Sequence, residues 1–227
     1  MYCNECGLGL LENEWRIGMD RWKDIFKQCG ITTITSLEGF DRRGFIMSLL
    51  NELSVMGDIK SLYVQIHRSR SGHFSESRYP VLGKGLHLMR ISSFGYRKPL
   101  AEIEDVLENN WLSLLAIDDI QDLYNYESAL KKIKEMIEES RRHLIISSSS
   151  FLPEYGDVDM EDVYYDEIKG FELLRKPIID ISDNVIRLWK DDYTPGPMKI
   201  SLLNTHRNMV ETREIRWDVD RFKYEFV

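Results

Sequence analysis

The chain has 227 residues, of which 43% are apolar and 30% are charged, a balance typical of a soluble globular protein. Its formal net charge of −8 argues against a protein that coats nucleic acid by bulk electrostatic attraction. No apolar run approaches the length of a membrane span, and the N-terminus lacks the basic region and long apolar core of a secretion signal. We therefore expect one large domain without a membrane span, in the cytoplasm or, if the source is eukaryotic, in the nucleus.

The three cysteines, Cys3, Cys6 and Cys29, form no even set of disulfides, which fits a reducing compartment. Cys3 and Cys6 have the spacing of half a zinc knuckle. A closed structural zinc site needs four ligands, and no second C-x-x-C pair or paired histidine follows. Cys29 or a partner chain would have to complete a metal site, so a chain without bound metal is the favoured interpretation.

Residues 1–14 show little periodicity, and we interpret them as a short N-terminal arm. Apolar residues recur at helical spacing in 21–27, and Gly30 is expected to end this helix. A β-branched run at 31–36 predicts a strand, and the apolar residues of 41–56 have the spacing of a helix.

Further strands are predicted at 61–67 and 86–91. The polar and basic segment between them, 68–80, is typical of an exposed loop. A helix starts at Pro99 and continues to about residue 109, because proline is favoured at the beginning of a helix.

An apolar run at 111–119 ends in two acids, Asp118 and Asp119, as a buried parallel strand does where it emerges at its carboxyl end. Open α/β sheets place their ligands at such ends. A helix at 126–141 follows, and a strand at 143–147 then runs into a tract of serines.

The segment 154–167 is strongly acidic, and we expect a loop there with a helix entering near Asp166. The rest of the chain alternates between apolar and polar residues with period two, which predicts antiparallel strands. These strands are expected at 184–189, 198–203, 214–219 and 222–226, with the Pro-Gly-Pro sequence at 195–197 turning one pair.

The junction between the strand at 31–36 and the helix at 41–56 is where a P-loop NTPase carries its phosphate-binding loop, G-x-x-x-x-G-K-[ST]. The segment keeps one glycine, Gly39, but departs from the pattern at all four defining positions. Ser36 and Asp41 replace the two glycines, Arg42 replaces the lysine, and Arg43 replaces the serine or threonine.

These replacements remove the chemistry of the loop. Asp41 adds a Cβ and a negative charge where the polyphosphate would lie, and Arg43 has no oxygen to offer a metal. Arg42 keeps a positive charge on a bulkier group. Two arginines at a helix N-terminus also oppose the helix dipole, so we expect them to pair with Asp41, Glu38 or a partner's acids. The alternatives are an anion site and a strand–turn–helix that never bound nucleotide.

The order of elements, together with five local motifs, resembles the RecA-like ATPase core, in particular its DnaB helicase, KaiC and RadA branches. The matching segments lie at 17–22, 114–121, 182–188, 191–193 and 204–208, and the resemblance covers 15–227. It implies a single domain over 15–227 behind the arm, with a three-layer αβα architecture. The central sheet would be largely parallel, with antiparallel strands at its C-terminal end.

The resemblance also marks what is missing. The position of the water-activating glutamate is His67, and the glutamine of the fourth core strand falls near Ser148. In the finger that acts on a neighbouring subunit, the lysine becomes Thr205, while Arg207 is retained. Asp118 alone matches a magnesium-linked position. The resemblance therefore implies a pseudo-ATPase that needs no cofactor.

Two further signals have a simple interpretation beside a functional one. Without a phosphate loop, Asp118 and Asp119 are expected to cap the next helix. The loop arginines Arg68, Arg70 and Arg78 lie near aromatic residues, a mixture that can grip single strands, although a solvated loop is favoured.

We therefore expect a catalytically inactive RecA/DnaB-like domain that acts as a protein-interaction subunit in DNA replication, recombination or repair. It would self-associate or bind a protein partner. One alternative is a divergent ATPase that uses its own Arg42 and Asp118 together with Arg207 from a neighbouring subunit. The other is a binder of single-stranded nucleic acid through residues 68–78.

Overall fold

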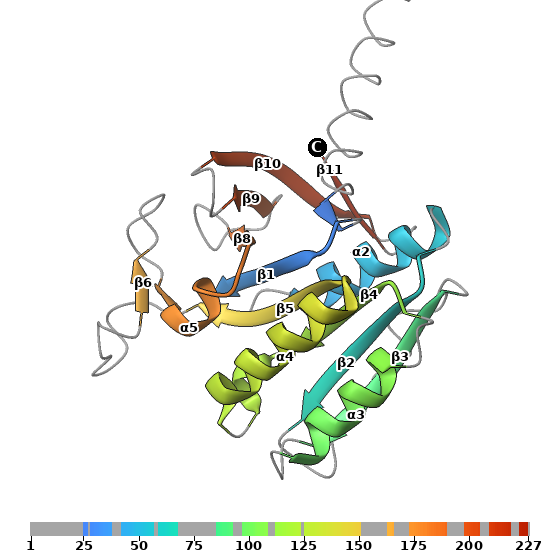
Figure 1. The fold of residues 1–227 in the computed structure, drawn as a ribbon. Coiled ribbons are helices and arrows are strands. Elements are labelled where there is room, and N and C mark those ends of the chain that lie inside the picture. The colour runs from blue at the N-terminus through green and yellow to red at the C-terminus, as the bar shows by residue number, and fades with distance from the viewer. Residues whose placement is uncertain are drawn as a thin grey trace, which may run out of the picture.

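A nine-stranded sheet organises the chain in the computed structural model (Figure 1). The structure describes residues 25–26, 28–37, 42–56, 59–67, 85–92, 97–108, 112–123, 125–150, 163–165, 173–189, 198–204, 209–218 and 223–226. The expected arm at 1–14, most of the helix at 21–27 and the turn at 195–197 lie outside these residues.

Six of the nine strands are parallel, in the order β8-β1-β5-β4-β2-β3. The protein is therefore an α/β protein with a mostly parallel sheet, as the sequence predicts. The bounds of these strands are Asn184–Trp189 for β8, Gly30–Leu37 for β1, His143–Ser150 for β5, Leu114–Asp118 for β4, Ser61–His67 for β2 and Leu86–Ser92 for β3.

The sheet continues beyond β8 with three antiparallel strands, as the period-two pattern predicts, but the first predicted antiparallel strand, 184–189, is β8, which pairs in parallel with β1 and antiparallel only with β9. They are β9 (Met198–Asn204), β10 (Met209–Asp218) and β11 (Lys223–Phe226). Two short strands, β6 (Val163–Tyr165) and β7 (Leu173–Arg175), form a separate antiparallel pair.

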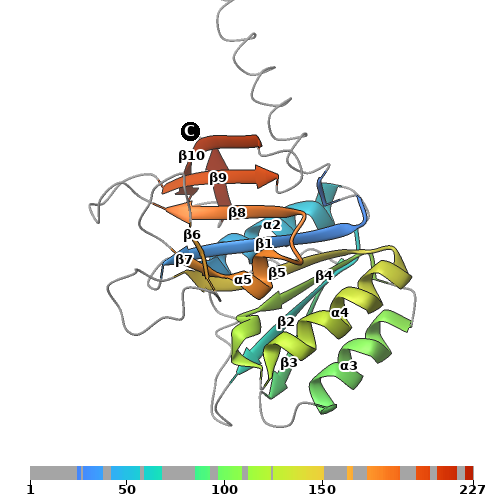
Figure 2. The same ribbon diagram turned by 60° about the vertical axis from the view of Figure 1, so that its left-hand side comes forward.

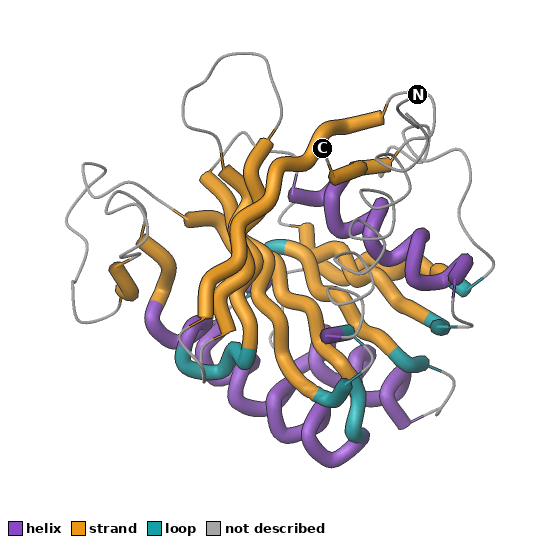
Figure 3. Tube along the Cα trace, turned by 90° about the horizontal axis from the view of Figure 1, so that it is seen from above, coloured by secondary structure: helices purple, strands orange, loops and turns teal. Residues whose placement is uncertain are grey.

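Helices cover both faces of the sheet, so three layers are present (Figures 2 and 3). The helix α2 (Arg42–Met56) packs on one face, and α3 (Arg97–Glu108), α4 (Tyr126–Ser140) and α5 (Lys176–Ile179) contribute to the core on the other. The chain moves in one direction along the sheet from β1 to β2 and in the opposite direction from β3 to β4 and β5. Right-handed crossovers in opposite directions place their helices on opposite faces.

Several boundaries differ from the sequence prediction. The strand β5 does not end at Ser147 but continues through the serine tract, because β1 supplies a parallel backbone partner as far as Ser150. Sheet neighbours outweigh the weak strand propensity of serine there. The expected helix near Asp166 is not confirmed. Its start lies outside the described residues, β6 falls within the predicted loop, and the next described helix is α5.

A buried histidine, His143, connects the beginning of β5 to the segment before β1. Its Nδ1 lies 2.7 Å from the carbonyl oxygen of Gln28, which can only accept, so Nδ1 carries the hydrogen. Its Nε2 lies 3.0 Å from Oγ1 of Thr32, and the ring packs edge-on against Phe26. Burial lowers the pKa of His143; the bond to Gln28 and the nearby Asp183 carboxylate oppose this only in part.

We predict that His143 makes the protein less stable in mild acid. Because the folded state has the lower pKa, the unfolded state binds a proton first as the pH falls below about 6.5. The contribution of His143 to the free energy of unfolding is complete above about pH 6.5. Below that pH, up to about 1.4 kcal/mol of this contribution is lost per pH unit. Urea unfolding of the wild type and His143→Gln at pH 7.5 and 5.5 should show a smaller pH effect in the variant. His87→Gln, in β3, is the control at an exposed histidine, and equal pH effects in the wild type and His143→Gln would contradict the prediction.

Candidate functional site

A crevice is expected where the connections of neighbouring strands leave the sheet toward opposite faces. After β1 the chain enters α2 on one face. After β4 it passes through the short helix η2 (Ile120–Asp122) into α4 on the other face. The strand β5 lies between β1 and β4. The carboxyl ends of these three strands therefore mark the position where an α/β sheet of this kind binds a ligand.

The side chains at these three ends are polar and face the side of the sheet that α2 covers. Ile34, Ala116 and Ile145 belong to the core beneath α2. Because side chains on a strand alternate, the residues two positions further along face the same side. These residues are Ser36, Asp118 and Ser147, and Ser149 continues the row on β5.

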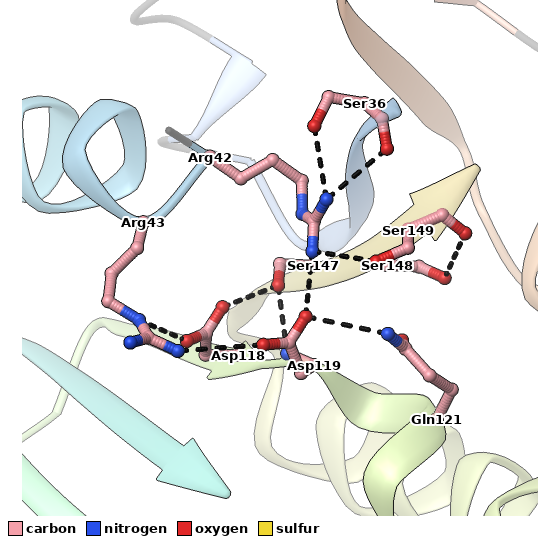
Figure 4. Close-up of polar contacts among 9 residues, drawn as sticks. All are labelled: Ser36, Arg42, Arg43, Asp118, Asp119, Gln121, Ser147, Ser148 and Ser149. Atoms are coloured by element: carbon pink, nitrogen blue, oxygen red, sulfur yellow. Dashed lines mark hydrogen bonds and ion pairs between the residues drawn. The ribbon is translucent and has the colours of Figure 1, made fainter. Parts of the chain in front are cut away.

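Arg42, the first residue of α2, fills the space between the three strand ends (Figure 4). Its Nη1 donates to the carbonyl oxygen and the Oγ of Ser36, at 3.2 and 3.0 Å. Its Nη2 donates to Oδ1 of Asp119 at 2.8 Å and to Oγ of Ser149 at 2.9 Å. One guanidinium thus links β1, β5 and the residue after β4, and its side chain is only 10% exposed.

Arg43 follows Arg42 in α2 and lies on the more exposed side of the cluster. Its Nε donates to Oδ2 of Asp118 at 2.7 Å, and its Nη2 lies 3.5 Å from Oδ2 of Asp119. The side chain of Arg43 is 43% exposed, whereas that of Asp118 is only 2% exposed. Burial lowers the pKa of Arg43, but the Asp118 carboxylate and Tyr63 outweigh it, so the net pKa is raised.

The two carboxylates are held in place by β5. Ser147 Oγ donates to Oδ1 of Asp118 at 2.6 Å and accepts from the backbone N–H of Asp119 at 2.8 Å. Asp119 has a left-handed backbone, with φ 50° and ψ 54°, a conformation that aspartate adopts more readily than most residues. This turn directs the Asp119 carboxylate toward Arg42, and Gln121 Nε2 also approaches it at 3.4 Å.

The electrostatics of the cluster are balanced by two arginines and two aspartates. Burial and the neighbouring Asp118 carboxylate raise the pKa of Asp119, and Arg42 and Arg43 oppose this increase. Burial and Asp118 likewise raise the pKa of Tyr63, which lies under α2. Breaking a buried ion pair costs about 3–5 kcal/mol. That exceeds the cost of up to about 1 kcal/mol for a basic residue that opposes the dipole at a helix N-terminus. For Arg42, whose side chain is only 10% exposed, the pairing with Asp119 therefore outweighs the helix dipole.

The structure brings together four of the predicted site residues: Ser36, Arg42, Arg43 and Asp118. Both arginines pair with the carboxylates of Asp118 and Asp119, which the sequence analysis did not name as partners; the expected partners Glu38 and Asp41 lie outside the described residues. The expected helix-capping role of the two aspartates is wrong: Asp119 precedes η2 without a side-chain capping hydrogen bond, and Asp118 is the last residue of β4. Both carboxylates are instead engaged by the arginines of α2.

Other predicted positions remain predictions. His67 ends β2, but its side chain is not described. Cys29 is exposed, and the described residues contain no group of three or more His, Cys, Asp or Glu that could hold a metal ion. None of the described helices is both long and apolar enough to cross a membrane. The remaining candidates lie outside the described residues: Cys3, Cys6, Gly39, Asp41, Arg68, Arg70, Arg78 and Arg207.

Sequence reasoning missed the roles of Ser147 and Ser149 and of Tyr63. A signal for the serines exists, because residues 143–150 alternate between the two faces, and every second serine must lie on the side of Asp118. Tyr63 gave no such signal, since its closeness to Asp118 and Arg43 depends on the pairing of β2 with β4.

No model of a known protein family and no curated protein matches this chain. The resemblance to RecA-like proteins therefore enters the functional interpretation as a proposal.

We predict that Arg42→Lys destabilises the protein by about 2 kcal/mol. The arginine fork reaches three strand ends, and a lysine ammonium cannot reach all of them, so it leaves some buried acceptors unpaired. Equilibrium urea unfolding would measure the change. Arg216→Lys, the same substitution at an exposed position of β10, is the control and should change the unfolding free energy by less than about 0.5 kcal/mol. Equal effects of the two substitutions would mean that the Arg42 fork carries no special stability.

Proposed function

We propose that this chain is a RecA-like domain that has lost nucleotide hydrolysis and serves as a protein-interaction subunit in DNA replication, recombination or repair. The observation that carries the proposal is the position of Arg42. Its guanidinium occupies the crevice at the carboxyl ends of β1, β5 and β4, where an open α/β sheet binds its ligand.

The architecture supports this proposal. The strand β1 is followed along the chain by the helix α2, and the acid-ended strand β4 comes later in the chain and lies two places from β1 in the sheet; this order of elements along the chain is the one on which the resemblance rests. The antiparallel strands β9 to β11 extend the sheet at its C-terminal end, also as the resemblance implies. These features agree with a RecA-like core, while the phosphate-loop residues do not fit a working hydrolase.

The divergent ATPase is the less favoured alternative because its cationic and acidic groups are already engaged with one another. Arg42 contacts β1 and β5 as well as Asp119, and Arg43 neutralises Asp118. A bound polyphosphate would have to displace these contacts and would then meet two carboxylates. Phosphoryl transfer requires cations that are free to stabilise the transferred group.

Binding of single-stranded nucleic acid through residues 68–78 remains the other alternative. No contact among the described residues favours it, so it becomes an outcome of the partner experiments below.

We predict that the wild-type protein does not bind ATP with Mg²⁺ detectably at millimolar ligand. Both carboxylates that could approach a metal are paired with arginine, and the two arginines described at these strand ends are thereby already engaged. Isothermal titration calorimetry is the measurement. Micromolar affinity that is lost in Asp118→Ala would overturn the proposed inactivity.

We predict that the protein self-associates, or pairs with another RecA-like subunit, through residues 1–14 and 38–43. A short arm with leucines and glycines has too little apolar surface to fold alone and should dock on a neighbour. Light scattering should show weaker assembly after deletion of 1–13 and after Arg207→Glu. Arg216→Glu, an exposed arginine of β10, is the matched control.

A strictly monomeric protein at high concentration, with candidate RecA-like partners added, would contradict the interaction role. Binding of single-stranded DNA that is lost when Arg68, Arg70 and Arg78 are changed together to alanine would favour the nucleic-acid alternative.

A further inference from the structure

The described atoms that hydrogen-bond to the Arg42 guanidinium all act as acceptors toward it. They comprise one backbone carbonyl oxygen and one hydroxyl from Ser36, one carboxylate oxygen from Asp119 and one hydroxyl from Ser149. A phosphate site has the opposite character, because it presents backbone N–H groups and free cations to the ligand. The crevice is therefore built to receive donors.

The arrangement of these acceptors fits the two terminal nitrogens of a guanidinium, whereas the Nε of Arg42 is buried without a hydrogen-bond partner among the described residues. The two acceptors of Ser36 receive Nη1 from the β1 side, while Asp119 and Ser149 receive Nη2 from the other side. A planar fork can satisfy both sets at once, whereas a compact ammonium cannot reach both sides. The side chain of Asp119 supplies the compensating charge.

We propose that the crevice between the carboxyl ends of β1, β5 and β4 is a guanidinium-binding site that Arg42 occupies from within the same chain. The inference deepens the proposed function and rests on it, since both treat the crevice as closed to phosphate. The inference adds that the chemical group this crevice accepts is a guanidinium cation. With the side chain of Arg42 removed, the crevice takes a small alkylguanidinium and rejects phosphate compounds.

The vacated crevice can be reached from solvent. The side chain of Asp119 is 22% exposed and that of Arg43 is 43% exposed, so the outer wall of the cluster is open to water. Contacts other than those with Arg42 also hold these acceptors in position. The Oγ of Ser147 accepts a hydrogen bond from the backbone N–H of Asp119. Ser36 and Ser149 lie opposite each other on the paired strands β1 and β5.

The test is chemical rescue of Arg42→Ala, followed by thermal unfolding. N-Ethylguanidinium at ten times its dissociation constant should raise the unfolding midpoint of this variant by about 4 °C. It should leave the wild type, whose crevice is filled, unchanged within error. Ethylammonium and ethylurea, which lack the fork or the charge, should give less than a third of that shift.

Arg43→Ala is the matched variant, because it removes an arginine from the same helix turn without emptying the space beside Ser36 and Ser149. It should show no selective response to ethylguanidinium. If Arg42→Ala does not fold alone, its refolding is measured with each compound. Recovery with ethylguanidinium alone supports the inference, and equal recovery with ethylammonium or none at all overturns it.

A nucleotide titration separates the two proposals. If Arg42→Ala binds ATP or inorganic phosphate more tightly than ethylguanidinium, the guanidinium site is wrong, while an inert wild type still agrees with the proposed function. If the wild type itself binds ATP with Mg²⁺, the proposed function fails whatever the result of the rescue.

Discussion

The pairing of Arg42 with Asp119 is the interaction on which the crevice depends. A guanidinium that is nine-tenths shielded from water must find acceptors and a compensating charge, because an unpaired buried charge costs several kcal/mol. The requirement is met by groups at three separate strand ends: Ser36 lies six residues before Arg42, whereas Asp119 and Ser149 are distant in the sequence. The carboxyl ends of β1, β5 and β4 are thereby joined through one side chain, in the place where related architectures hold a ligand.

The same constraint explains why the two arginines are tolerated at the beginning of α2. The helix dipole disfavours positive charge there, and the first turn contains no acid that would relieve it. Relief comes from the sheet, since Asp118 and Asp119 approach from β4 and its following turn. Ser147 holds both aspartates at once, by donating to the first and accepting from the backbone of the second. Among the described residues, the two arginines and the two aspartates thus compensate one another's charge.

Much of the architecture could be predicted from the sequence. The β-branched run that became β1, the apolar run ending in Asp118 and the alternating C-terminal segments carry local patterns that survive in the folded sheet. The predicted ends of strands were wrong where pairing with a neighbouring strand decides how far a strand extends. The serine tract has little preference for a strand, yet it remains in β5 because β1 pairs with it throughout. The short pair of β6 and β7 lies in or near a segment whose acidic composition suggested a loop, and there too pairing outweighed composition.

The sequence by itself determined that the phosphate-binding residues are absent and that two arginines stand at a helix N-terminus, because both facts are local. It also determined that polar residues follow the apolar part of three strands. Only the tertiary structure decided what those residues do. The order of strands in the sheet placed β5 between β1 and β4, and this brought Ser36, Ser149 and Asp119 around one guanidinium. Such a site depends on contacts between residues more than 70 positions apart, and its partners are chosen by sheet register and by the cost of burying charge, neither of which a local pattern records.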